Sequence, residues 1–169
     1  DIPQMLSGLV VGRLLKFLAK LSKAKYILEI GTFTGYSTLC LAEGIEKSGM
    51  IYTCEIDKKT AMLAQSHFNQ SPYSKNIKLL IGPALEQINK ISKNNFDLIF
   101  IDADKINYPN YYEQSLKLLK TNGIMIIDNC LWSGNVLNPK DESSKAISEL
   151  NRIISQDIRV ENVFLTVRD

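Results

Sequence analysis

Two short polar stretches in the second half of the chain carry the residues best suited to chemistry. Asp102 follows the apolar run 96–101, and Asp128 and Asn129 follow the apolar run 124–127. Such runs are typical of central strands in a parallel sheet, whose carboxyl ends lie along one edge where ligands bind. Two carboxylates and an amide oxygen there would suit Mg²⁺, Mn²⁺ or Ca²⁺. A single aspartate after a strand is commonly a helix cap or turn residue, so the hypothesis depends on all three.

A lysine stands close to the first of these aspartates. Asp104 and Lys105 come directly after Asp102 and one alanine, and His67 is the only histidine in the chain. Because His67 lies inside an expected helix, a histidine triad or a histidine-based zinc site is disfavoured. Chemistry at this site would then depend on carboxylates, a lysine, hydroxyls or a metal. The structural alternative is a surface salt bridge from Lys105 to Asp104 or Asp102.

A glycine turn early in the chain predicts a nucleoside site. An apolar run passes through Glu29 to Gly31, and Gly35 follows four residues later. The pattern indicates strand, tight turn and helix, the first unit of a doubly wound α/β sheet. Glycines in such a turn permit positive φ and let the backbone approach a ligand. Phe33 occupies the place of the second glycine of the dinucleotide motif G-x-G-x-x-G, so an uncharged or cationic nucleoside is favoured over a pyrophosphate.

An acid lies about twenty residues beyond the glycine turn. Glu55 ends the expected strand 50–55, at the place where nucleoside-binding α/β folds hold a ribose diol. Two carboxylate oxygens can accept both diol hydrogens, so Glu55 is the predicted ribose ligand. Asp57 is the competing candidate, although we expect it to cap the helix 58–69.

The remaining segments alternate between helical and strand patterns. Apolar residues at steps of three and four, among them Val10 and Phe17, predict a helix over 4–21. The other expected elements are strands at 77–81 and 159–167, and helices at 38–43, after Gly82-Pro83, from Tyr112 to a cap at Asn122-Gly123, and at 145–156.

Two motifs together resemble a known enzyme family. The sequence E-I-G-T-F-T-G-Y-S at 29–37 resembles the first motif of S-adenosylmethionine-dependent O-methyltransferases, in the metal-dependent branch that includes caffeoyl-CoA and catechol O-methyltransferases. D-A-D-K-x-N-Y at 102–108, followed by D-N at 128–129, matches the metal and catalytic motif of that branch and is far more specific. The resemblance covers nearly the whole chain. It implies one methyltransferase domain over 1–169, doubly wound and Rossmann-like, with a mostly parallel sheet, helices on both faces, and a last strand missing from this segment.

The resemblance also implies roles for individual residues. Lys105 and Asp102 would be catalytic, and Asp102, Asp128 and Asn129 would bind the cation. Ser133 would contact the acceptor; the plant enzymes have an asparagine at its position, so a phenylpropanoid-CoA acceptor is not implied. Trp132 would form one wall of the acceptor pocket, since a lone indole near the ligands can stack on an aromatic acceptor, with core packing as the alternative. The residues expected around S-adenosylmethionine are Met5, Ser7, Glu29, Gly31, Thr32, Phe33, Gly35, Ser37, Glu55, Ala84, Asp102 and Asp104.

The implied reaction moves a methyl group from S-adenosylmethionine to a hydroxyl oxygen of a small aromatic, catechol-like acceptor bound to a divalent cation, preferably Mg²⁺. A hydroxylated uridine in tRNA is the alternative acceptor. Two other classes compete: a nicotinamide-dependent (NAD) oxidoreductase, supported by the glycine turn and Glu55, and a non-catalytic adenosylmethionine-binding or RNA-binding module. Neither needs Lys105 and the three oxygen ligands.

Composition limits the cellular compartment and the partners that we expect for this protein. Cys40, Cys54 and Cys130 lack the C-x-x-C spacing of zinc and redox sites, and we interpret them as reduced thiols of a cytoplasmic protein. A net charge of +2 is too small to predict a nucleic-acid surface. No long apolar run or leader indicates a membrane partner. By resemblance we expect a homodimer and a segment that is incomplete at both ends.

Overall fold

The computed structural model describes residues 7–91 and 95–167. Their strands form one sheet in which every pairing is parallel, in the order β3-β2-β1-β4-β5. The strand order reverses between β1 and β4, which places a crevice at their carboxyl ends. The doubly wound α/β fold expected from the sequence is confirmed. The strands are β1 (Tyr26–Ile30), β2 (Met50–Glu55), β3 (Ile77–Ile81), β4 (Phe96–Ile101) and β5 (Leu119–Ile127).

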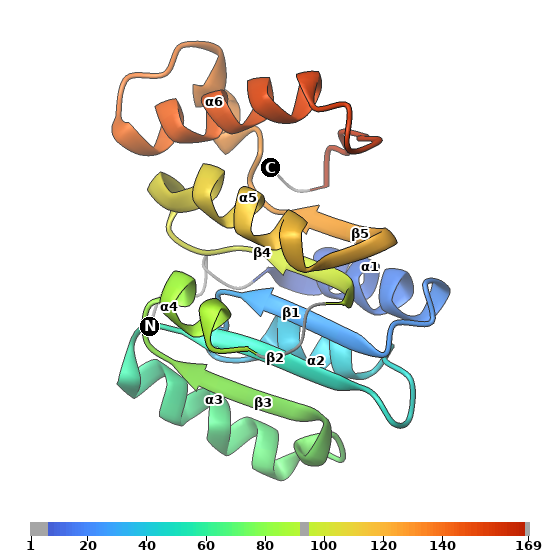
Figure 1. Cartoon of the computed structure of the whole chain (residues 1–169). Helices are drawn as coiled ribbons and strands as arrows, with labels where there is room; N and C mark the ends of the chain where they lie inside the picture. The colour runs from blue at the N-terminus through green and yellow to red at the C-terminus, as the bar shows by residue number, and fades with distance from the viewer. Residues whose placement is uncertain (1–6, 92–94, 168–169) are drawn as a thin grey trace.

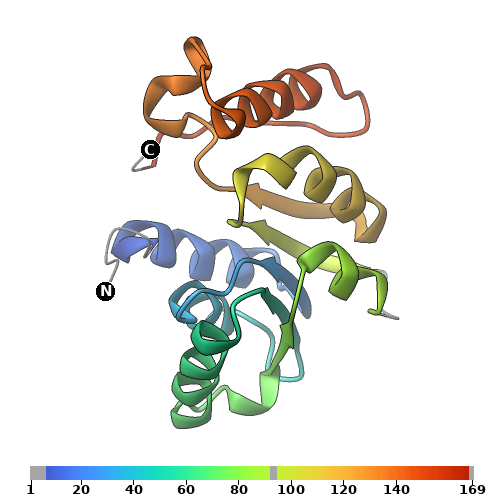
Figure 2. The same cartoon turned by 90° about the vertical axis from the view of Figure 1, so that its left-hand side faces the viewer.

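Helices cover both faces of this sheet (Figures 1 and 2). One face is covered by α1 (Gly8–Leu21), α2 (Tyr36–Ala42) and α3 (Lys58–Gln70); the other by α4 (Ala84–Asn89) and α5 (Tyr108–Leu118). The last helix, α6 (Glu142–Gln156), packs against α5 beyond the β5 side of the sheet. Within the described ranges, no helix is both long enough and apolar enough to cross a bilayer.

Alternation along the central strands divides the core into two layers. In β1, Ile27 packs with α1 and α2, whereas Leu28 and Ile30 pack with α4, α5 and α6. In β4, Leu98 and Ile99 divide in the same way. Successive side chains of a strand point to opposite faces, so a strand covered on both sides needs an unbroken apolar run. This explains the runs that carry Asp102 and Asp128.

The apolar residues that predicted the first helix are not the ones that it buries. Among the described residues, α1 buries Val11, Leu15 and Ala19, while Val10 and Phe17 are 65% and 59% exposed. The helix therefore has apolar side chains on two faces, and only one of them packs on the sheet. The spacing predicted the end of the helix at Leu21 correctly, but the helix begins at Gly8, so Ser7 was wrongly included. The spacing did not identify the buried face, because both apolar faces share the same period.

The predicted boundaries of the fifth helix and strand were wrong. The helix ends at Leu118 rather than at Asn122-Gly123, because Leu119 already pairs with Phe96 of β4. Asn122 has φ 63° and lies in an irregular part of β5, between Leu119 and the regular pairing that starts at Ile124. Asn122-Gly123 thus forms a bulge in the strand instead of a helix cap. Bulges and helix caps both favour a residue in the left-handed conformation, so the same dipeptide suits either.

The strand expected over 159–167 is not formed. Its described part has a turn at Arg159 and no ladder pairing, and Val163 and Leu165 are 79% and 59% exposed. A strand requires a neighbour for its N–H and C=O groups, and this segment has none in the described sheet. Two further helices begin earlier than predicted, α2 at Tyr36 instead of 38 and α6 at Glu142 instead of 145.

Candidate active site

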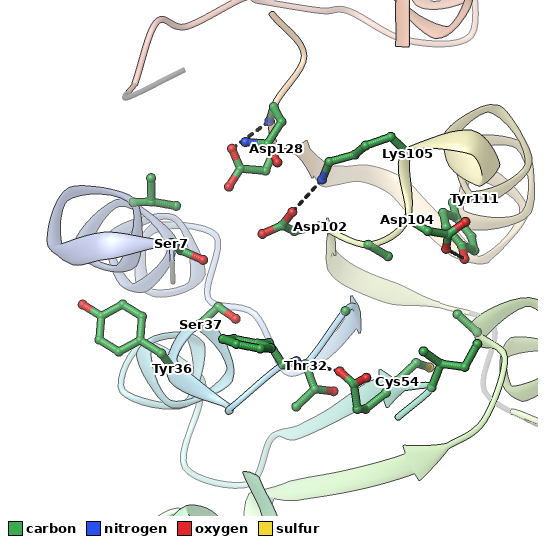
Figure 3. A pocket seen from close by; sticks show the side chains of 18 of the residues that line it. Ser7, Thr32, Tyr36, Ser37, Cys54, Asp102, Asp104, Lys105, Tyr111 and Asp128 are labelled. Carbon is green, nitrogen blue, oxygen red and sulfur yellow. Dashed lines mark hydrogen bonds and ion pairs between the residues drawn. The ribbon is translucent and has the colours of Figure 1, made fainter. Parts of the chain in front are cut away.

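A cavity of about 810 Å³ opens at the carboxyl ends of the strands, where the strand order reverses. Most of the residues predicted to bind ligands line it, and Figure 3 shows many of their side chains directed into it. On the β1 and β2 side these are Ser7, Gly31, Thr32, Phe33, Ser37, Glu55 and Ala84. On the β4 and β5 side they are Asp102, Asp104, Lys105, Asp128, Asn129, Trp132 and Ser133.

Two predicted residues do not line this wall, Gly35 and Glu29. A third, Met5, lies outside the described residues. Gly35 does not line the cavity; it has φ 89° and begins α2, where a Cβ would lie 2.4 Å from the ring of Phe68. Glu29 is fully buried beneath the cavity.

The turn after β1 requires a glycine at its first position. Gly31 has φ 104°, and a Cβ there would lie 1.9 Å from the carbonyl oxygen of Asp102. This contact joins the ends of β1 and β4, so only glycine allows the two strand ends to approach each other so closely. Phe33 also has positive φ, 48°, although it is not a glycine. Its N–H donates to Glu55 Oε2 at 2.8 Å, which holds the turn against β2.

Glu55 is fixed by backbone donors. Its Oε2 accepts from Phe33 and its Oε1 accepts from the N–H of Asp57 at 2.9 Å. Both oxygens retain further acceptor capacity toward the cavity. Asp57 itself accepts from the N–H of Thr60 at 2.7 Å as the N-cap of α3. The capping role expected of Asp57 is confirmed, and Glu55 lines the cavity, so its role as the ribose ligand stays a prediction.

Glu29 supports the turn from below. Its Oε2 accepts hydrogen bonds from the hydroxyls of Thr38 and Thr53, while its Oε1 has no hydrogen-bond partner among the described residues. Burial raises the pKa of Glu29 to about 7, against the opposing effect of neighbouring hydroxyls. A buried carboxylate is costly because few groups replace its hydration.

The predicted catalytic residues converge on the β4–β5 edge. Ile101 pairs with Ile127, so Asp102 and Asp128 occupy equivalent positions at neighbouring strand ends. Lys105 Nζ donates to Asp102 Oδ1 at 2.9 Å, and its side chain is only 10% exposed. This pair lies in the cavity wall (Figure 3). The salt bridge considered as the alternative role of Lys105 is present, but it is largely buried and faces the ligand space.

Aromatic rings surround the ammonium group of Lys105. Its Nζ donates to the hydroxyl of Tyr108 and lies 4.6 Å from that ring's centroid. The ring of Trp132 is 5.7 Å away. Aromatic faces attract a cation electrostatically and exclude water from it. The position of Lys105 is therefore set by Asp102, Tyr108 and Trp132 together.

The loop after β5 has an unusual backbone. Asn129, Trp132 and Ser133 have φ of 58°, 49° and 52°, and Gly134 has φ 82°. The N–H of Asn129 donates to Asp128 Oδ1 at 2.8 Å, which closes the turn at the strand end. Left-handed residues other than glycine are costly and are concentrated at functional sites. The loop brings Asn129, Trp132 and Ser133 to the cavity.

The oxygen atoms at this edge suit a hard divalent cation by their chemistry. Two carboxylates and one amide come from the ends of neighbouring strands, and hard cations select such ligands. In residues 7–91 and 95–167, no group of three His, Cys, Asp or Glu side chains could hold a metal. That observation is compatible with the predicted set, because its third member is the amide of Asn129.

Several cavity residues were not foreseen. Thr34, Tyr36, Cys54 and Ile56 extend the turn and the end of β2, positions that proximity to Gly35 and Glu55 could have suggested. Tyr111 comes from α5 and had no motif to mark it. Further residues that line the cavity are Val11, Gly82, Ala103 and Val167.

Comparison with known proteins decides the family. A family model described as O-methyltransferase matches residues 1–169. The chain belongs to the O-methyltransferase family. It is 36% identical over 163 residues to the mouse catechol O-methyltransferase domain-containing protein 1, covering 93% of this chain and 62% of the mouse protein. It is 31% identical to a caffeoyl-CoA O-methyltransferase of Stellaria longipes, covering 95% of this chain and 71% of that enzyme.

A solved O-methyltransferase connects this family with its methyl donor. The Bacillus cereus enzyme, crystallised with S-adenosylhomocysteine, is 34% identical and superposes with a TM-score of 0.88. The match covers 94% of this chain and 74% of that one. S-adenosylhomocysteine is what remains of S-adenosylmethionine once its methyl group has left. The family is thus one of S-adenosylmethionine-dependent O-methyltransferases, as the two sequence motifs indicated.

Proposed function

We propose that this chain transfers a methyl group from S-adenosylmethionine to a hydroxyl oxygen of a small acceptor with two adjacent hydroxyls, with a divalent cation at Asp102, Asp128 and Asn129. The observation that carries the proposal is the convergence of these three residues and Lys105 on one edge of a cavity whose other edge holds Glu55 and the glycine turn. A catechol-like compound is the simplest acceptor of this kind.

The donor would lie across the ends of β1 and β2. Glu55 is already held by two backbone N–H groups, so its orientation is set before a ribose diol binds. A fixed acceptor saves the entropy of ordering it on binding. The donor would lie against the backbone of Thr32 and Phe33, which line the cavity. Gly31 brings this turn close to the end of β4.

Methyl transfer requires the acceptor oxygen as an anion, in line with the sulfonium methyl group. The protein contributes mainly by holding the reacting atoms in that arrangement. When bound, a divalent cation lowers the pKa of a hydroxyl that it contacts. In its neutral amine form, Lys105 would take the hydroxyl proton at Nζ, beside Asp102. Trp132 would form an aromatic wall for the acceptor.

The first test combines the donor with a chelator. Turnover of a catechol acceptor with S-adenosylmethionine should fall to background in EDTA and return with excess Mg²⁺. Asp102→Ala should lower metal-dependent turnover roughly a thousandfold or more, because a ligand of the cation is lost, while calorimetric binding of S-adenosylmethionine largely survives. Lys120→Ala, which alters a lysine paired with Asp97 outside the cavity, is the matched control. Equal activity with and without EDTA would remove the cation from the mechanism.

A further inference from the structure

The cavity contains a second acid whose surroundings differ from those of Asp102. Asp104 makes no ion pair within the described chain, and its neighbour Lys105 bonds to Asp102 and Tyr108 instead. Both carboxylate oxygens of Asp104 accept from neutral groups. The hydroxyl of Tyr111 donates to Oδ1 at 2.5 Å, and the amide of Asn107 donates to Oδ2 at 2.6 Å.

These two donors orient the carboxylate and leave its charge uncompensated. Each carboxylate oxygen has two acceptor sites, so one on each oxygen remains available. Asp104 is exposed and lines the cavity, whereas Tyr111 is 5% exposed and comes from α5. Burial and the bond to Asp104 both raise the pKa of Tyr111, so the phenol keeps its proton at neutral pH and remains a donor.

The pair lies toward the end of β2. Tyr111 and Cys54, the residue before Glu55, belong to the same buried apolar cluster, and both line the cavity. Figure 3 shows Asp104 and Tyr111 on the opposite side of Lys105 from Asp128. The pair therefore faces the part of the cavity where Glu55 would hold a ribose.

We propose that Tyr111 is a positioning residue for the methyl donor: it holds Asp104 in the orientation in which that carboxylate accepts a hydrogen bond from the adenosyl part of S-adenosylmethionine. The proposal rests on the proposed function in taking S-adenosylmethionine as the ligand of the cavity. It does not depend on the cation, because neither Tyr111 nor Asp104 is among the three predicted ligands of the cation.

The neighbouring residue offers a matched control. Tyr112 is buried to 2% exposure on the same helix, and its hydroxyl donates to Asp157 Oδ2 at 2.8 Å. Tyr112 does not line the cavity. Tyr111→Phe and Tyr112→Phe thus each remove one phenol hydroxyl bonded to an aspartate, but only the first touches the ligand space.

The experiment is calorimetric titration of the intact protein with S-adenosylhomocysteine and with 5′-methylthioadenosine, which lacks the amino-acid part. Tyr111→Phe should raise the Kd of both ligands by the same factor, about tenfold, as expected for losing the alignment of a charged acceptor. Tyr112→Phe should leave both Kd values unchanged. Thermal unfolding should show that the two variants remain folded at the titration temperature.

A double-mutant cycle separates positioning from packing. In an Asp104→Asn background, Tyr111→Phe should have little further effect on Kd, because the carboxylate that it orients is gone. Wild-type affinity in Tyr111→Phe, or an undiminished loss in the Asp104→Asn background, would overturn the proposal. Failure of the wild-type protein to bind either ligand would instead overturn the proposed function.

Discussion

At the scale of single residues, Lys105 is the side chain on which the proposed chemistry depends most. It is held by Asp102 on one side and by the hydroxyl of Tyr108 on another, in a largely buried position. Because Lys105 lines the cavity and is largely buried, we expect its amine to take a proton from a ligand bound there. Its contribution should therefore appear in the chemical step rather than in donor binding.

Lys105→Met keeps most of the aliphatic stem but removes the amine. We expect kcat to fall by about 10²- to 10⁴-fold, the usual contribution of a general base, with the Kd of S-adenosylmethionine unchanged. Steady-state kinetics with calorimetry would check this. Unchanged kcat would show that Lys105 serves only as the structural partner of Asp102.

Glu29 makes a pH-dependent contribution to stability. Its folded-state pKa of about 7 is above the ordinary value of 4.5, because burial disfavours the charged form. The native state therefore binds its proton more tightly than the unfolded chain does. The stability due to Glu29 is complete below about pH 4.5 and is lost as the pH rises through 7.

Glu29→Gln should remove this dependence while keeping an acceptor for Thr38 and Thr53. The Tm of the wild type minus that of the variant should fall by roughly 5 °C between pH 5 and pH 8. Calorimetric unfolding at both pH values measures it. A difference that rises with pH would mean that Glu29 is stabilised as a carboxylate.

At the scale of elements, the end of β2 and the start of α3 place two acids close together with separate tasks. Glu55 faces the cavity and Asp57 caps the helix. The backbone N–H of Asp57 also donates to Glu55, a contact that no side-chain substitution at Asp57 removes directly. The two roles can therefore be tested separately.

Asp57→Ala should cost about 1 kcal/mol of unfolding free energy through loss of the N-cap and leave donor affinity unchanged. Glu55→Gln should do the reverse, with affinity for S-adenosylmethionine reduced roughly tenfold, because an amide cannot accept both ribose hydroxyls. Denaturant unfolding and calorimetry on both variants would distinguish them. If only Asp57→Ala weakened the binding of S-adenosylmethionine, Asp57 rather than Glu55 would be the ribose ligand.

At the scale of the whole molecule, the cavity joins parts of the chain that are far apart in sequence, from Ser7 to Val167. A ligand that fills it should therefore stabilise the fold globally. Saturation at about 100 times Kd should add roughly 2.7 kcal/mol. The expected homodimer stays a prediction, as does the cytoplasmic setting.

Thermal unfolding with S-adenosylmethionine should thus show a Tm higher by roughly 5 to 10 °C, whereas NAD at the same concentration should cause no shift. The expected difference follows from Phe33, which replaces a glycine of the dinucleotide motif. A shift with NAD alone would mean that the glycine turn binds a dinucleotide after all.

The features that the sequence determined by itself are those with a local physical signal. Apolar runs that end in Gly31, Glu55, Asp102 and Asp128 identified four strand ends of a parallel sheet, and parallel strands bring such ends to one edge. The capping role of Asp57 also followed from its neighbours alone.

Only the tertiary structure decided features that depend on partners distant in sequence. Glu29 belongs to the glycine motif but lies beneath the cavity, because strand alternation directs it toward Thr38 and Thr53. Segment 159–167 reads as a strand but finds no partner in the described sheet. Tyr111 enters the site only because α5 packs its first turns against the strand ends. Periodicity and motifs describe a residue's own segment, whereas its partners depend on how all segments pack.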